Sequence, residues 1–274
     1  MYYNTFIIII FLLYNMMGKK VISYCLFGDK LKYCHGIIEA IISSNLIFLD
    51  WEVRVYYSIG KQAVPQSVID ILKNLNCVLI PFAETNKCKG EDIEGMMWRF
   101  CPLGEDDVDY WLSRDADSRS SYREKKMIDE WLESDKAIHS ILDHPCHGNL
   151  MGCNFGINNK KIKERYPDKI LNMNKFIPDL ASKHDIRRGY DQNWIGNHFM
   201  NIMKTRKDIL VHLNKRDDCL KRCHIGGIKP VHEHFHTILV ENTQDFCGKQ
   251  INYSNRRLSR PVVEIESLQL EGTK

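Results

Sequence analysis

The sequence predicts an α/β fold, in which a mostly parallel sheet is flanked by helices within one domain. Strand-like and helix-like segments alternate along residues 20–80, and this order gives a parallel sheet with right-handed crossovers. The chain has 274 residues, of which 44% are hydrophobic and 27% are charged, so it can bury a core. A polar, acidic segment follows the fourth predicted strand, which is where open α/β sheets bind ligands.

The spacing of apolar residues predicts each element in turn. Residues 20–27 are apolar, β-branched and aromatic and end at Gly28-Asp29, a pattern typical of a buried strand. Residues 51–57 alternate between apolar and polar side chains, which predicts the second strand. The other elements of this half are a helix at 33–45, a helix at 65–75 and a strand at 77–80.

The second half of the chain continues this order of elements. The predicted elements are a helix at 94–100, a strand at 108–112, a helix at 125–134, a helix at 193–203 and a strand at 209–211. We expect these elements to complete one domain over residues 18–225. Residues 226–274 are then a C-terminal extension. The sequence leaves its order open, because Gly226, Gly227 and Pro230 break the regular pattern.

Residues 1–17 form an apolar leader, with the run FIIIIFLLY at residues 6–14. This run is shorter than the roughly 20 residues that a membrane-spanning helix needs. No basic residue precedes it and no small-residue cleavage site follows it, which argues against a signal peptide. Three interpretations stay open: a membrane anchor over residues 6–17, an additional strand or helix of the domain, and a true start at Met16 or Met17.

Charge and cysteine usage narrow the class of protein and the compartment. The 38 basic and 35 acidic residues are too evenly balanced for a dedicated nucleic-acid-binding protein. The ten cysteines include no CxxC pair and lack the dense, regular spacing of a disulfide framework. Reduced thiols in a reducing compartment such as the cytoplasm are therefore favoured, and a membrane-anchored location is the alternative.

The strongest local feature is Asp115-x-Asp117, directly after the strand predicted at residues 108–112. Two carboxylates that flank one residue can share a hard divalent cation, and Mg²⁺ or Mn²⁺ suits such oxygen ligands. A cation held in this way can also bind a diphosphate. Asp107-x-Asp109 has the same pattern, but Asp109 falls inside the strand. Helix capping and turn formation are the alternative roles of Asp115 and Asp117.

Several segments around this pair carry a resemblance to a known family. In chain order they are VISYCLFGD at 21–29, WEVRVY at 51–56, WRF at 98–100, RDADSR at 114–119, RE at 123–124, EWL at 130–132, DHP at 143–145, the glycine segment at 152–156 and YDQ at 190–192. Together they resemble a family of GT-A-type glycosyltransferases found in bacteria and large DNA viruses. The resemblance covers about residues 19–215 and implies a GT-A-like, Rossmann-type fold with a single catalytic domain.

The resemblance implies roles for the residues that match its motifs. Asp117 is implied to bind the metal directly, and Asp115 to contact the metal or the ribose of a nucleotide sugar. Residues 23–28 are implied to form the wall of the base site. Within them, Tyr24 or Phe27 would stack on the base.

Two arginines and one histidine complete the implied donor site. Arg99 and Arg114 match positions where a cation meets the diphosphate, and arginine suits bidentate phosphate contacts. For Arg99, a surface or helix-terminal arginine is the alternative. His212 is implied to complete the metal shell or to contact phosphate. The family commonly continues with Asp-Ser there, whereas this chain has Leu213-Asn214.

The cluster that begins at Asp143 and the glycine segment at 152–156 are implied to line the sugar and acceptor side. Asp191 is the best candidate for a general base or for a contact to a sugar hydroxyl, because a carboxylate can accept a proton. A helix N-cap is the alternative role of Asp191. The family commonly has a second Gly and a Trp where this chain has Cys153 and Phe155.

The histidines of His232-Glu-His234-Phe-His236 could lie on one face of a strand, which is a workable arrangement for a metal. Their spacing does not match the usual zinc pattern, in which H-x₃₋₅-H is paired with CxxC. A solvated, histidine-rich strand or loop is therefore expected.

The resemblance thus implies a glycosyltransferase that uses Mn²⁺ or Mg²⁺ to move a sugar from a nucleotide-diphosphate sugar to a hydroxyl acceptor, on a glycan, a lipid or a protein glycan. Its expected partners are the nucleotide sugar and the glycan acceptor, with no nucleic acid. Two alternatives stay open. One is a catalytically silent scaffold that binds nucleotide or glycan, and the other is a metal-dependent phosphodiesterase or nuclease that uses the same carboxylates.

Overall fold

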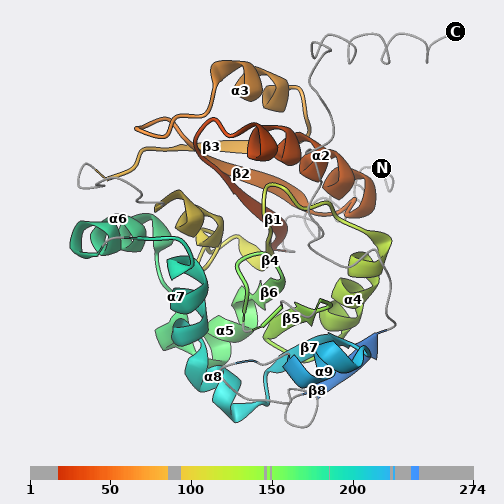
Figure 1. Ribbon diagram of the computed structural model, residues 1–274. Coiled ribbons are helices and arrows are strands. Elements are labelled where there is room, and N and C mark those ends of the chain that lie inside the picture. The colour runs from red at the N-terminus through yellow and green to blue at the C-terminus, as the bar shows by residue number, and fades with distance from the viewer. Residues whose placement is uncertain are drawn as a thin grey trace, which may run out of the picture.

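One mixed sheet forms the centre of the computed structural model, which describes residues 18–85, 94–144, 147–148, 150–184, 186–222, 225 and 236–240. Eight strands in this part follow the order β3-β2-β1-β4-β6-β5-β7-β8 (Figure 1). They are β1 (Lys19–Leu26), β2 (Glu52–Ser58), β3 (Val78–Phe82), β4 (Val108–Ser113), β5 (Ile138–Leu142), β6 (Phe155–Asn158), β7 (Ile209–Asn214) and β8 (His236–Val240). β6 runs antiparallel to β4 and β5, and the other neighbouring pairs are parallel. The expected mostly parallel α/β sheet is confirmed.

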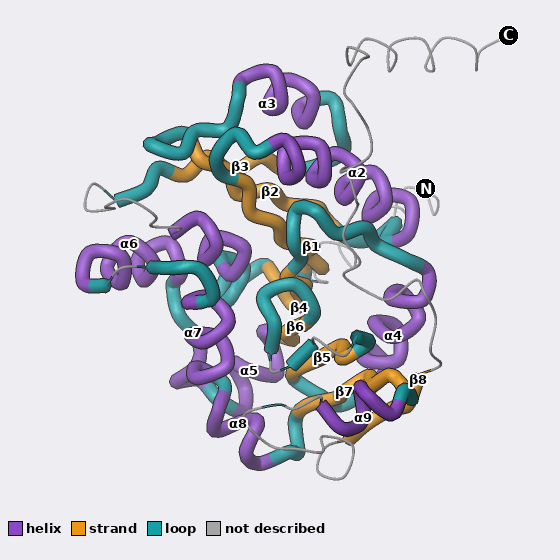
Figure 2. The backbone as a smooth tube through the Cα atoms, viewed as in Figure 1, coloured by secondary structure: helices purple, strands orange, loops and turns teal. Residues whose placement is uncertain are grey.

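Helices pack against both faces of this sheet. One face shares a core with α2 (Leu31–Ile47), α3 (Gln66–Lys73) and α4 (Tyr122–Glu133). The other shares a core with η1 (Glu94–Phe100), α5 (Asn159–Arg165), α6 (Met173–Lys183), α7 (Tyr190–His198), α8 (Met200–Thr205) and α9 (Asp217–Arg222). A short 3-10 helix, η2 (Pro167–Lys169), joins α5 to α6. Figure 2 shows α6, α7 and α8 along one side of the strands.

The first strand, β1, carries apolar side chains on both of its faces. Val21 and Cys25 belong to the core under η1, whereas Ile22, Tyr24 and Leu26 belong to the core under α2. Successive side chains of a strand point to opposite faces, so a strand that is covered on both faces has no polar side. The prediction of a buried strand at this position is confirmed.

The structure differs from the predicted elements in three ways. The helix predicted at residues 193–203 is two helices, α7 and α8, that meet at Phe199. Phe199 is fully buried, and its φ of −96° and ψ of 8° leave the α-helical range. The segment at 94–100 is a 3-10 helix rather than an α-helix. Strands β5 and β6 and the helices α5, η2, α6 and α9 had no counterpart among the predicted elements.

Some predictions concern residues outside the described part. These are the apolar leader at 1–17, with its anchor interpretation, and all of the extension at 226–274 except β8. His232 and His234 therefore lie outside the described residues, and His236 is the first residue of β8. Within the part of the chain that the structure describes, no helix combines the length and hydropathy needed to cross a membrane.

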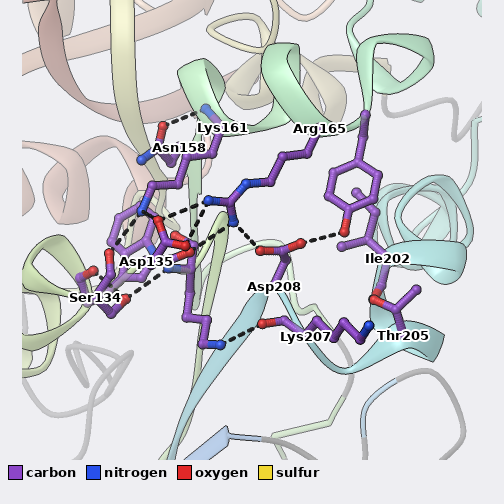
Figure 3. Close-up of polar contacts among 12 residues, drawn as sticks. Ser134, Asp135, Asn158, Lys161, Arg165, Ile202, Thr205, Lys207 and Asp208 are labelled. Carbon is purple, nitrogen blue, oxygen red and sulfur yellow. Dashed lines mark hydrogen bonds and ion pairs between the residues drawn. The ribbon is translucent and has the colours of Figure 1, made fainter.

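A network of ion pairs holds the amino ends of β5 and β7 against α5 (Figure 3). Arg165 pairs with Asp135 at 2.8 Å and also with Asp208. The Tyr166 hydroxyl donates to Asp208 at 2.5 Å, and Lys161 Nζ lies 3.0 Å from Asp135. Parallel strands place their ligand-binding loops at the opposite, carboxyl edge, so this network belongs to the scaffold.

We predict that Gly36→Ala destabilises the fold, because α2 passes very close to the segment after β4. A Cβ at Gly36 would lie 2.6 Å from the Ala116 carbonyl oxygen and 2.8 Å from Asp117 Cα, so backbone would have to move. The expected loss is about 1–3 kcal/mol in the free energy of unfolding, measured by urea denaturation. Gly196→Ala in α7 is the matched control. Its Cβ would meet nothing within 4 Å, so a gain of up to about 1 kcal/mol is expected. Equal stability of Gly36→Ala and the wild type would contradict the close approach.

Candidate functional site

The segment after β4 carries the paired aspartates at the carboxyl edge of the sheet. The Arg114 N–H donates to the Ser23 carbonyl at 3.0 Å, which extends the pairing of β4 with β1. The Ser118 N–H donates to the Asp115 carbonyl at 3.1 Å, which closes a turn around the pair. Asp117 is buried, whereas the Asp115 side chain is 35% exposed. One carboxylate is thus fixed inside the protein, and the other reaches the surface.

Arg99 is the centre of the site. It lies in η1, it is buried, and its guanidinium pairs with Asp115 through Nη1 and with Asp191 through Nη2. Burial alone would lower the pKa of Arg99, but the two carboxylates raise it, so the group stays charged. The structure thereby excludes the alternative that Arg99 is a surface arginine. It joins residues 99, 115 and 191, which the sequence analysis treated as separate candidates.

Asp191 is not a helix N-cap. Gly189 occupies the N-cap position of α7, and Asp191 lies in the first turn with no exposed surface. Its Oδ2 accepts from Arg99, whereas its buried Oδ1 has no hydrogen-bond partner among the residues that the structure describes. A buried carboxylate oxygen without a partner is costly, so this atom is suited to accept from a ligand hydroxyl.

Gly152 makes room for the Arg99–Asp191 pair. A Cβ at this position would lie 2.7 Å from Arg99 Cζ and 2.8 Å from Asp191 Oδ2. The Gly152 carbonyl also accepts from the Ser113 hydroxyl, which ties this loop to the end of β4. Gly152 of the glycine segment therefore packs directly against the paired groups.

Lys32 was not among the predicted site residues. It lies in the first turn of α2, and its Nζ is 2.6 Å from Asp117 Oδ2. In the described structure, a cation therefore contacts each carboxylate of the Asp-x-Asp pair, Arg99 at Asp115 and Lys32 at Asp117. The sequence signal that could have identified Lys32 is its place just after the first strand, where helices of α/β sheets begin beside the ligand.

Arg114 points into the protein rather than toward a ligand. It is buried, and its Nε donates to Glu124 at 2.5 Å. Its Nη1 donates to the carbonyls of Cys153 at 3.3 Å and Phe155 at 3.2 Å. Arg114 thereby joins β4, α4 and the start of β6. A diphosphate contact would require it to give up these bonds.

The two predicted stacking residues lie on opposite faces of β1. Tyr24 is fully buried, and its hydroxyl is 2.8 Å from Ser44 Oγ, which is 2.9 Å from Ser120 Oγ. Burial raises the pKa of Tyr24 to about 12. Its ring has no exposed face for a base, and its hydroxyl supports the segment after Asp117. Phe27 is partly buried at the carboxyl end of β1, so it remains the candidate for stacking.

Asp143 is held by two neighbours at the end of β5. Arg123 donates to both of its oxygens, at 2.9 and 2.7 Å, and Asn214 Nδ2 donates to it at 2.9 Å. The Asp143 N–H donates to His147 Nδ1 at 3.2 Å. Asp143 is buried, so its carboxylate fixes the segment that follows β5.

His212 lies in a buried chain of polar side chains between β7, β5 and α4. Its Nδ1 is 2.8 Å from His139 Nε2, and its Nε2 is 2.8 Å from Glu130 Oε2. Burial lowers the pKa of His212, whereas the hydrogen bond to Glu130 acts to raise it. Across the described residues, no group of three or more His, Cys, Asp or Glu side chains is arranged to hold a metal ion. The metal role of His212 remains a prediction.

Comparisons with known proteins identify similar solved structures but no family. No protein-family model matches the chain, and no curated protein matches it. A mannosyltransferase from Pyrobaculum calidifontis in complex with GDP-Man and Mn²⁺ is 11% identical, with a TM-score of 0.40 over 54% of this chain and 46% of its own. TarS 1–349 from S. aureus is 12% identical, with a TM-score of 0.42 over 67% of this chain and 56% of its own. The galactosyltransferase LgtC, with donor and acceptor sugar analogues, is 13% identical, with a TM-score of 0.44 over 82% of this chain and 87% of its own.

The chain thus spans about half the length of the first two of these structures. Similarities at this level do not establish a family, so the function is inferred below from the site's own residues.

We predict that the fold loses stability between pH 6.5 and pH 4. Burial lowers the pKa of His147 to about 4, below its ordinary value of 6.5. As the pH falls through this window, the unfolded chain takes up a proton at residue 147 before the folded chain does. Protonation therefore favours unfolding by about 3 kcal/mol at pH 4.

The measurement is urea denaturation at pH 7 and pH 4 for the wild type and His147→Asn. The variant lacks this proton uptake, so its stability should fall by about 3 kcal/mol less over the same window. An equal fall in both proteins would show that His147 is not buried as a neutral side chain.

Proposed function

We propose that this protein is a metal-dependent glycosyltransferase, which transfers a sugar from a nucleotide-diphosphate sugar to a hydroxyl acceptor on a glycan, a lipid or a protein glycan. The donor would lie at the carboxyl edge of the sheet, between the end of β1 and the segment after β4. Phe27 is the residue we propose to stack on the base.

One observation carries this proposal: each carboxylate of the Asp-x-Asp pair contacts a basic side chain at that edge. Asp115 pairs with Arg99, and Asp117 lies 2.6 Å from Lys32 Nζ. A diphosphate with a divalent cation needs both kinds of group, carboxylates for the cation and basic side chains for the phosphate oxygens. A purely structural ion pair would need only one carboxylate and one cation.

The residues present fit a divalent metal. Mg²⁺ usually takes one or two carboxylates and completes its shell with substrate phosphates and water. Asp117 and Asp115 supply such carboxylates from one loop, and we propose that they hold Mn²⁺ or Mg²⁺. The metal supplies stabilisation of the negative charge on the departing diphosphate. Arg99 fixes the position of the Asp115 carboxylate through their ion pair.

We propose that the sugar lies beside the glycine segment at residues 152–156. Asp191 Oδ1 is buried, and among the described residues it has no hydrogen-bond partner, so it is available for a sugar hydroxyl. A role as general base would require the same oxygen to reach the acceptor hydroxyl. Asp143 has both oxygens bound by Arg123, so we propose that it positions the loop after β5.

We predict that Asp117→Asn abolishes metal-dependent nucleotide binding while the fold persists. The variant loses the charge at the buried carboxylate and, among the residues that the structure describes, its ion pair with Lys32. Thermal-shift measurements with nucleoside diphosphates and nucleotide sugars, in Mn²⁺ or in EDTA, provide the readout. A ligand present at about 100 times its Kd stabilises the folded state by about 2.7 kcal/mol, which is a clear shift in Tm.

The matched control is Asp109→Asn, because Asp107-x-Asp109 repeats the same pattern at the other end of β4. This control should keep the Mn²⁺-dependent shift of the wild type. An Asp117→Asn protein that binds nucleotide with Mn²⁺ as the wild type does would refute the metal site. Binding without any sugar transfer would identify the silent scaffold, and cleavage of phosphodiesters would identify the nuclease.

A further inference from the structure

The contact between Lys32 and Asp117 joins a movable cation to a fixed carboxylate. The Asp117 side chain is 2% exposed, whereas the Lys32 side chain is 40% exposed. The Asp117 backbone packs closely against α2, since a Cβ added at Gly36 would lie only 2.8 Å from Asp117 Cα. Lys32 carries its ammonium group on a flexible four-carbon stem. If another cation approached Asp117, Lys32 would be the partner that moves.

A divalent metal and the ammonium group would compete for the same oxygen. Mg²⁺ binds carboxylate oxygens at about 2.0–2.1 Å. Lys32 Nζ lies 2.6 Å from Asp117 Oδ2, so a metal on this atom would be placed against the ammonium group. Two cations at such a separation repel each other strongly inside a protein. Asp117 can therefore hold one of them at a time.

We propose that Lys32 is an internal counter-cation of the metal site. It neutralises Asp117 when no metal is bound, and it turns to the diphosphate of the donor when the metal takes its place. This inference rests on the proposed function, since it assigns a role to Lys32 at that same site. The negative charge of the diphosphate compensates for the positive charge that the metal brings.

The alternative is that Lys32 only fastens the start of α2 to the segment after β4. The two roles predict opposite changes in metal affinity. A fastening residue would leave the Mn²⁺ affinity unchanged when it is replaced, or would weaken it as the loop loosened. A competing cation would strengthen it, because its removal frees the carboxylate.

The test uses the full chain, with Mn²⁺ alone as the first probe and a nucleoside diphosphate in saturating Mn²⁺ as the second, both by calorimetry. Lys32→Gln should bind Mn²⁺ alone about fivefold more tightly than the wild type, and the diphosphate about fivefold more weakly. Lys32→Arg keeps the charge, so its affinities for Mn²⁺ and for the diphosphate should stay close to those of the wild type. Lys30→Gln removes the same charge from an exposed residue two positions away and should change neither affinity.

The outcomes separate this inference from the proposed function. If the wild type binds no nucleoside diphosphate in saturating Mn²⁺, the proposed function fails. If it does bind, an unchanged or weaker Mn²⁺ affinity in Lys32→Gln overturns the counter-cation role alone. Tighter Mn²⁺ binding with unchanged diphosphate affinity overturns the movement of Lys32 to the donor.

Discussion

The buried guanidinium of Arg99 is the interaction on which the site depends. It joins η1, the segment after β4 and α7 through its pairs with Asp115 and Asp191. A buried charge is costly unless it is paired, so each of these elements is held where it can satisfy Arg99. Residues 99, 115 and 191 are far apart in the sequence, and this cation fixes their relative positions. The scaffold, rather than a bound ligand, therefore sets the geometry of the candidate donor site.

Close packing around these pairs leaves little freedom to the backbone. Gly152 permits the approach of Arg99 to Asp191, and Gly36 permits the approach of α2 to Asp117. A second buried pair, between Arg114 and Glu124, fixes the start of the aspartate segment from the opposite side. The buried groups of the site thus form a rigid support, while the side chains of Lys32 and Asp115 reach the surface. A movable cation beside a fixed carboxylate is the arrangement that would let metal and donor bind in turn.

Sequence patterns predicted the elements that have a clear apolar pattern of their own. They did not predict elements whose position depends on contacts with distant parts of the chain. Strands β1 to β4 were predicted because their apolar and β-branched side chains form patterns that can be recognised within each segment alone. The four-residue strand β6 was missed because it is too short to show a pattern of its own and its pairing depends on β4 and β5. Asp115 and Asp117 were identified from their place after a strand, whereas Lys32 became evident only once α2 lay beside them. Strand alternation could have assigned Tyr24 to the α2 face, since Ile22 and Leu26 share it.

A double-mutant cycle on Arg99→Met and Asp191→Asn tests the central claim most directly, through the free energies of unfolding. Each single variant removes one member of a buried ion pair, so each should be strongly destabilised. The double variant should be more stable than the sum of the two losses requires, by about 1.5 kcal/mol or more. Additivity within about 0.5 kcal/mol would mean that Arg99 and Asp191 do not depend on each other, and the account of the site would fail.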